Sequence, residues 1–212
     1  MQLKHRFVAI VGVVLLIAGP ATTKALANTV VGMKIGLAQS QLNVDGWGGS
    51  EWHSGITVGP YVSIGVNSHL SVEPNLLFTQ LGGTFRDQSS LPGGWLQVVE
   101  EVAYSVDYLE VPLLFRFRPS PGGSMPIVLI AGPVWRTVLS SEWSFDGDSR
   151  EDWAESPAFA IALGVGVEAQ LGKLEGRLEI LYNRSLTTVG SSDSFTDDGS
   201  LSGFNFQMGL GF

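Results

Sequence analysis

The sequence ends with Phe204-Asn205-Phe206-Gln207-Met208-Gly209-Leu210-Gly211-Phe212, in which large apolar residues alternate with small or polar ones. Successive side chains of a β-strand point to opposite faces, so this stretch predicts a strand with one apolar and one polar face. A tilted strand needs about 9 to 11 residues to cross a bilayer. The end of the chain therefore predicts a strand of membrane-crossing length.

The same alternation occurs in seven stretches further upstream. Together with residues 203–212, the predicted strands are 30–39, 55–67, 70–80, 107–118, 126–139, 158–171 and 174–184. In each stretch one parity is apolar over most of its length, as in Met33-Ile35-Leu37 or Leu113-Phe115-Phe117. We expect this parity to face lipid. Near Asp107 we expect a β-bulge that turns Tyr104 and Val106 to the same face, and bulges at Pro60, Pro74 and Pro133.

The opposite parity collects glycine and charge, and an eight-stranded barrel has an interior just wide enough for side chains. The charged residues on it are Lys34, Arg116, Arg118, Arg136 and Arg177 against Glu73, Glu110, Glu168, Glu175 and Glu179. Unpaired charges are costly in such an interior, so the five-to-five balance predicts a lumen ionic network. We expect Glu73 and Glu110 to pair with Arg116, Arg136 or Arg177.

The connections between the predicted strands alternate in length. Residues 67–69, 119–124 and 172–173 are short turns, whereas the long connections are 40–54, 81–106, 140–157 and 185–202. Outer-membrane barrels have short periplasmic turns and long extracellular loops. The sequence therefore predicts an all-β fold, an eight-stranded antiparallel up-and-down transmembrane β-barrel.

The first residues have the pattern of an export signal. A positive start at 4–6 precedes an apolar core at 7–18 and a small-residue cleavage site at 25–27. The apolar core is 12 residues long, whereas a helix needs about 20 to cross a bilayer. We therefore expect residues 1–27 to be a signal peptide and 28–212 to be the barrel domain.

Composition excludes several classes of function. The formal net charge is −8, and an acidic chain is a poor partner for nucleic acid. The absence of cysteine excludes disulfides, thiolate nucleophiles and cysteine-based zinc sites. His53 near Ser50 and Glu51 lacks a positioned partner for hydrolysis, and Arg150 breaks the calcium-loop pattern that begins at Asp146. We predict no enzymatic activity, no cofactor and no metal site.

The long connections hold 14 of the 20 acidic residues, so we expect a negative extracellular cap. They also hold five of the six tryptophans: Trp47, Trp52, Trp95, Trp143 and Trp153. One interpretation is a loop recognition surface for sugar, lipopolysaccharide or a host protein. The other is an interfacial girdle together with loops that pack on each other, since tryptophan concentrates at membrane interfaces.

Four motifs together resemble the PorT-like outer-membrane β-barrel domain family. They are Gly32-Met-Lys34-Ile-Gly36-Leu37, Val72-Glu-Pro-Asn-Leu76, Tyr108-Leu-Glu-Val-Pro-Leu-Leu114 and Ala131-Gly-Pro133. The resemblance implies an eight-stranded barrel in the outer membrane of a Gram-negative bacterium, and little about activity. The strand that ends at Phe212 resembles the signal by which the outer-membrane assembly machinery recognises its substrates.

Taken together, these features predict a non-enzymatic outer-membrane barrel, structural or surface-interacting through its acidic, tryptophan-bearing loops. Its expected partners are outer-membrane lipids, lipopolysaccharide and the assembly machinery. One alternative is a narrow solute or ion channel, which requires that the lumen charges leave a continuous wet path. The other is a soluble periplasmic lipocalin-like binder, in which the apolar face would point inward.

Overall fold

A computed structural model describes residues 29–44, 50–90, 97–122, 125–145, 148–151, 157–187 and 199–212. The predicted signal peptide, residues 1–27, lies outside these ranges. Within the described part of the chain, no helix has the length and apolar character needed to cross a membrane.

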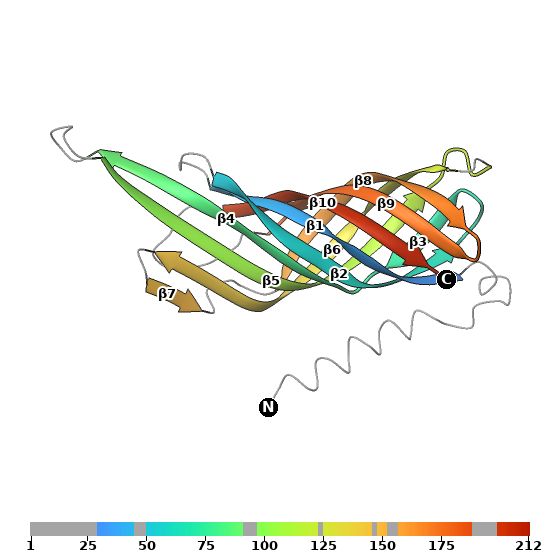
Figure 1. The fold of residues 1–212 in the computed structure, drawn as a ribbon, viewed down its shortest axis with the longest axis horizontal. Helices are drawn as coiled ribbons and strands as arrows, with labels where there is room; N and C mark the ends of the chain where they lie inside the picture. Colours follow the sequence, from blue (N-terminus) through green and yellow to red (C-terminus); the bar gives the residue numbers. More distant parts are fainter. Residues whose placement is uncertain are drawn as a thin grey trace, which may run out of the picture.

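All regular structure in the described residues is β-strand (Figure 1). The strands are β1 (Thr29–Val44), β2 (Ser50–Gly65), β3 (Leu70–Pro74), β4 (Leu77–Ser90), β5 (Gln97–Phe117), β6 (Ile127–Phe145), β7 (Asp148–Glu151), β8 (Ala158–Leu171), β9 (Leu174–Ser185) and β10 (Gly199–Gly211). Each pairs antiparallel with its neighbours, and the pairings β1–β10 and β5–β6 close the sheet on itself.

The ten segments form eight barrel strands. β3 and β4 are two halves of one strand, because their register against β5 continues unchanged from Pro74↔Leu113 to Leu77↔Glu110. β7 lies outside the cycle and pairs only with the far end of β6. The structure therefore confirms the predicted closed eight-stranded antiparallel barrel.

The burial of side chains confirms which face points outward. Along β9, buried and exposed residues alternate from Arg177 to Ser185. Ile35, Leu163 and Leu210 on the apolar parity are 57%, 50% and 46% exposed. Lys34 and Arg116 on the charged parity are 2% and 0% exposed. The apolar face of the barrel is its outer surface, and the charged parity faces the lumen.

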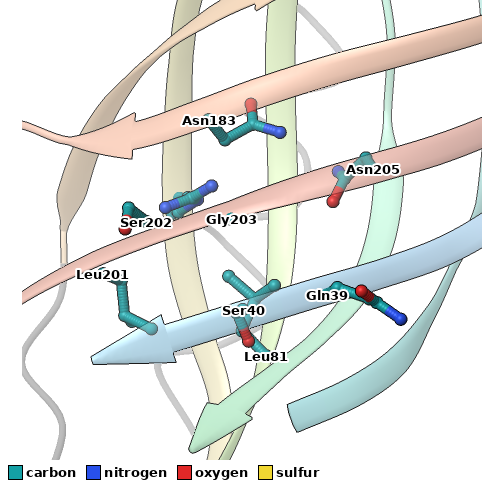
Figure 2. A pocket seen from close by; sticks show the side chains of 9 residues that line it. Gln39, Ser40, Leu81, Asn183, Leu201, Ser202, Gly203 and Asn205 are labelled. Atoms are coloured by element: carbon teal, nitrogen blue, oxygen red, sulfur yellow. The ribbon is translucent and has the colours of Figure 1, made fainter. Parts of the chain in front are cut away.

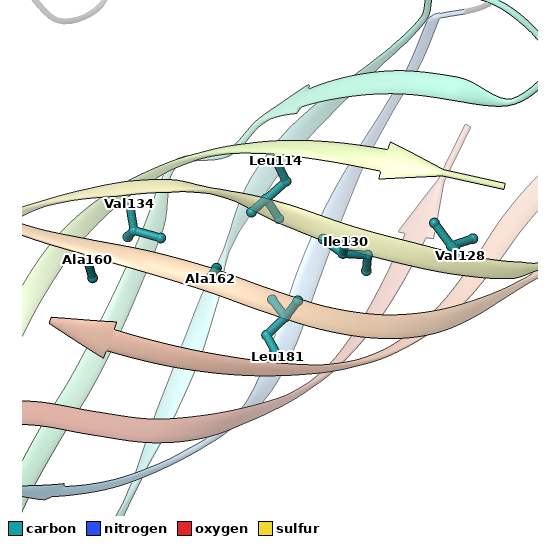
Figure 3. Close-up of a cluster of buried hydrophobic side chains, with 7 residues drawn as sticks. All are labelled: Leu114, Val128, Ile130, Val134, Ala160, Ala162 and Leu181. Atoms are coloured by element: carbon teal, nitrogen blue, oxygen red, sulfur yellow. The ribbon is translucent and has the colours of Figure 1, made fainter. Parts of the chain in front are cut away.

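One wall of the lumen is apolar as well. Its buried cluster consists of Leu114, Val128, Ile130, Val134, Ala160, Ala162 and Leu181, on β5, β6, β8 and β9 (Figure 3). The lumen is therefore packed by hydrophobic contacts along this wall and by charged and polar groups opposite it. Burial of this kind, at about 25 cal/mol per Å² of apolar surface, stabilises the closed barrel from inside.

The expectation for Tyr104 and Val106 was wrong. They are 3% and 0% exposed, so they point into the lumen. The register does shift near Asp107, but the extra residue is on β6, because Asp107 pairs with Ser140 and Tyr108 with Val138. Leu139 is thus the bulged residue, and β5 keeps its phase. Tyr104 and Val106 are thus further buried apolar side chains of the lumen.

The prolines are accommodated without bulges, contrary to expectation. On either side of Pro133 the pairs Pro112↔Val134 and Phe115↔Ala131 keep one register. The β5–β6 ladder therefore has a gap in pairing at Pro133 but no inserted residue. Pro74 ends β3 at the break before β4. A proline has no N–H to donate, so a ladder bond missing at its nitrogen leaves no unsatisfied donor on the proline.

The strands extend further than the alternation predicted. The β4–β5 hairpin runs out to the pair Ser90↔Gln97, and β6 continues to Phe145, where β7 pairs with it. The predicted loops 81–106 and 140–157 are thus largely strand. These extensions lie at the end of the barrel opposite the C-terminus (Figure 1). Beyond the membrane a hairpin needs no apolar face, so its pairing leaves no hydrophobic alternation in the sequence.

Candidate functional site

The predicted lumen charges fall into two groups in the structure. The larger group, here called the central network, joins four cations with four glutamates: Lys34, Arg116, Arg118, Arg177, Glu73, Glu168, Glu175 and Glu179. These residues come from β1, β3, β5, β8 and β9 and from the residue that follows β5. Since most of them lie near the short turns, the network fills the half of the lumen next to those turns.

Glu73, like Glu168, contacts three cations of the central network. Its carboxylate lies 2.6 Å from Lys34 Nζ and 3.4 Å from Arg116 Nη1, and it also pairs with Arg177 Nη1. Glu73 is fully buried. A buried carboxylate without such partners would carry a desolvation penalty of several kcal/mol.

Arg116 is the corresponding hub among the cations. Its Nη1 lies 2.5 Å from Glu179 Oε1 and its Nη2 lies 2.8 Å from Glu168 Oε1. Glu179 also accepts from Lys34 Nζ at 2.9 Å. Because the guanidinium is planar and presents several donors, it can bridge carboxylates on opposite walls of the lumen.

Among the described residues, the central network is partly exposed to solvent on the side next to the short turns. There Arg118 binds Glu168 at 2.6 Å and 3.0 Å and also lies 3.2 Å from Ser71 Oγ. Arg177 Nε lies 2.5 Å from Glu175, whose side chain is 20% exposed. The charge network thus connects the barrel interior to the periplasmic turns.

Tyr61 is the residue in this region that sequence reasoning missed. Its ring lies 4.6 Å from the Arg177 guanidinium and 5.2 Å from Lys34 Nζ, within range of cation–π attraction. A side chain at Gly32 would overlap that ring. The available signal was that Tyr61 shares the inward parity of β2.

The second group is a single ion pair in the half of the lumen farther from the short turns. Arg136 Nε donates to Glu110 Oε1 at 2.6 Å, and Thr79 Oγ1 donates to Glu110 Oε2 at 2.9 Å. Arg136 also donates to Ser185 Oγ at 3.0 Å and lies 5.8 Å from the Tyr108 ring. Each charge here has one ionic partner, whereas Glu73 has three.

Beside Arg136 lies a small polar pocket (Figure 2). It is lined by Gln39, Ser40, Leu81, Arg136, Asn183, Leu201, Ser202, Gly203 and Asn205. Its free volume is about 10 Å³, which is room for about one water molecule. Within the described residues, no cluster of acidic or histidine side chains could hold a metal ion.

The predicted tryptophan surface is described only in part. Trp52 lies in β2 with half of its side chain exposed, 6.1 Å from the ring of Phe204. Trp143 lies in β6 and not in a loop. Trp47, Trp95 and Trp153 lie outside the described residues, as does Asp146 of the calcium-loop candidate.

The chain belongs to the outer membrane protein beta-barrel domain family, whose model matches residues 27–212. Among solved structures, it is similar to Neisserial surface protein A, with 10% identity and a TM-score of 0.50 over 85% of this chain and 95% of that one. OprG from Pseudomonas aeruginosa has 12% identity and a TM-score of 0.48, over 87% and 95% of the two chains. Ail of Yersinia pestis, in complex with a heparin analogue, has 16% identity and a TM-score of 0.47, over 87% and 99%. No curated protein matches the chain significantly.

These findings place the protein in the outer membrane. The family and the outward apolar face exclude the lipocalin-like alternative, which needs the opposite orientation. At the identities found, the resemblance to solved structures concerns the fold alone. A general role as an outer-membrane barrel is therefore established.

Proposed function

We propose that this protein is a non-enzymatic, non-conducting outer-membrane barrel that acts through its extracellular end. The observation that carries the proposal is the packed lumen. The central network pairs its four cations with four glutamates, and an apolar cluster lines the other wall. An ion passing through would have to displace buried ion pairs, which are costly to separate.

The extracellular end offers the larger surface for partners. The β4–β5 hairpin and the β6–β7 pairing extend away from the C-terminal end of the barrel. The long connections predicted from sequence carry most of the acid and five tryptophans. Such a surface suits a cationic partner, or lipopolysaccharide phosphates bridged by divalent ions.

Two narrower assignments belong to the same proposal. The Tyr108–Leu114 motif and its three companions support placement among PorT-like barrels. The alternating strand that ends at Phe212 supports recognition by the outer-membrane assembly machinery. Residues 1–27 would be removed on export.

A shortened β4–β5 hairpin tests the proposal. Arg86 pairs with Glu101, so residues 87–100 can be replaced by Asn-Gly, a favoured two-residue hairpin turn. The full chain and the shortened variant are each reconstituted in planar bilayers and in vesicles. Boiled and unboiled samples in SDS gels verify that both form closed barrels.

We expect neither protein to give discrete conductance steps. We expect the full chain, displayed on cells, to adhere to a polylysine-coated surface, and the shortened variant, which lacks Asp87, Glu100 and Trp95, to adhere less. Discrete conductance from the full chain would favour the channel alternative. Equal adhesion of the two proteins would show that the hairpin is not part of the interaction surface.

A further inference from the structure

Arg184 is placed unlike every other described cation of the barrel strands. It lies on the outward parity of β9, after Leu178, Ile180 and Tyr182, and its side chain is exposed. Among the lysine and arginine side chains that the structure describes, those within the barrel strands otherwise point into the lumen, and Lys173 lies in a turn. A cation on the membrane-facing surface of a barrel strongly destabilises the fold at mid-bilayer and has little effect on its stability near the edge of the bilayer.

The height of Arg184 along the barrel places it at the outer edge of the bilayer. β9 starts at the turn containing Gly172 and Lys173, on the side of the short connections, and ends at Ser185. Just below Arg184 is an outward aromatic group, in which the Tyr182 and Phe204 rings lie 5.3 Å apart and Trp52 lies 6.1 Å from Phe204. Aromatic belts mark the level of lipid headgroups.

Neighbouring strands add polar groups at the same level. Arg184 pairs with Ser202 on β10, which in turn pairs with Gln41 on β1. Two residues further along β10, Phe204 pairs with Gln39 on β1, and the Gln39 side chain is exposed. These residues share the outward parity, so Arg184, Ser202, Gln41 and Gln39 form one patch of hydrogen-bonding side chains across β9, β10 and β1.

Arg184 is free to take a ligand. Within the described residues it donates no hydrogen bond and forms no ion pair. A guanidinium presents a planar fork of donors that matches the oxygens of a phosphate group.

We propose that Arg184, with Gln39, Gln41 and Ser202, binds a phosphate of the lipid A headgroup of lipopolysaccharide on the outer surface of β1, β10 and β9. Trp52, Phe204 and Tyr182 lie against the glycolipid below its phosphate. The site is on the outside of the barrel wall, so it is independent of the lumen and of the β4–β5 hairpin.

The test measures lipid retention by the full chain in phosphatidylcholine nanodiscs doped with diphosphorylated lipid A. Native mass spectrometry counts the lipid A molecules that stay bound. The variants are R184Q, the conservative R184K, and K173Q, which removes the same charge from a periplasmic turn. Boiled and unboiled gel mobility checks that each variant forms a closed barrel.

We expect R184Q to weaken retention of lipid A about tenfold, the effect of losing one charge-assisted phosphate contact, and R184K to weaken it less. K173Q should match the natural protein. Lipid A stripped of its phosphates should bind the natural protein as weakly as diphosphorylated lipid A binds R184Q.

Three outcomes would overturn the proposal. One is equal retention by R184Q and K173Q. Another is equal retention of lipid A with and without phosphates. The third is equal displacement by phosphatidylglycerol at matched charge, which would reduce the effect to general attraction of anionic lipid.

Discussion

The inward and outward faces of this barrel both carry arginine, but they accommodate its charge in different ways. Arg116 in the lumen is fully buried and contacts three glutamates. Arg184 on the outer surface has no partner among the described residues and lies at the rim. In the interior a charge is stable only with opposite charges beside it, and on the lipid face it is stable only where it reaches headgroups or water.

The sharpest way to break this arrangement is to remove one charge from the central network. Glu73→Gln keeps the size of the side chain but leaves Lys34, Arg116 and Arg177 with one anion fewer. We expect a loss of about 3–5 kcal/mol in the free energy of unfolding, because a buried charge becomes unpaired. Urea unfolding in lipid vesicles measures it.

A charge-compensated variant is the control for that measurement. Adding Lys34→Met to Glu73→Gln restores equal numbers of positive and negative groups. We expect it to recover part of the lost stability. If Glu73→Gln alone unfolds with the natural midpoint, the network does not stabilise the barrel.

The outward face can be tested with a charge placed where it meets hydrocarbon. Leu113 faces outward on β5, four residues above Phe117. We expect Leu113→Arg to cost about 2–4 kcal/mol, the range for a cation near mid-bilayer on the lipid face. The same unfolding assay applies. Gln170→Ser, near the periplasmic turn, should change stability by less than about 0.5 kcal/mol, and equal costs at the two positions would contradict the assignment of faces.

Among the changes of charge, the smallest effect is expected at the isolated ion pair. Replacing Arg136 by Met and Glu110 by Leu together removes both charges, and paired apolar replacement of a buried ion pair is often neutral. We expect a change within about 1 kcal/mol for the double variant, and a larger loss for Glu110→Leu alone. Urea midpoints of the single and double variants make this comparison. A double variant as unstable as the single one would show that Thr79 and Ser185 depend on the pair.

The barrel strands and their two faces could be predicted from sequence because lipid imposes a strict alternation on every residue that crosses it. The outer ends of β4 and β5 could not, since pairs such as Arg86↔Glu101 form in water, where neither face must be apolar. Tyr104 and Val106 misled the prediction for a related reason. Part of the lumen is itself apolar, so hydrophobicity alone does not tell inside from outside there.

The lumen charges could be identified from sequence by parity and balance, but their partners could not. Lys34 and Glu179 are 145 residues apart in the chain and meet only because β1 and β9 flank β10. The role of Tyr61 depends on the same closure. Pairings of this kind depend on the stagger between strands, which periodicity leaves open.

The central network also has a consequence for how the barrel reaches one structure. Sliding a strand by two residues keeps its apolar side chains toward lipid, so hydrophobicity does not distinguish that misaligned barrel from the native one. The ion pairs do distinguish it. In the native alignment Lys34 lies opposite Gly209, and its ammonium contacts Glu73 and Glu179. A two-residue slip would carry its ammonium roughly 7 Å along the barrel, away from those carboxylates. The lipid-facing residues thus select which side of each strand is outside, and the buried charges select the shear at which the cylinder closes.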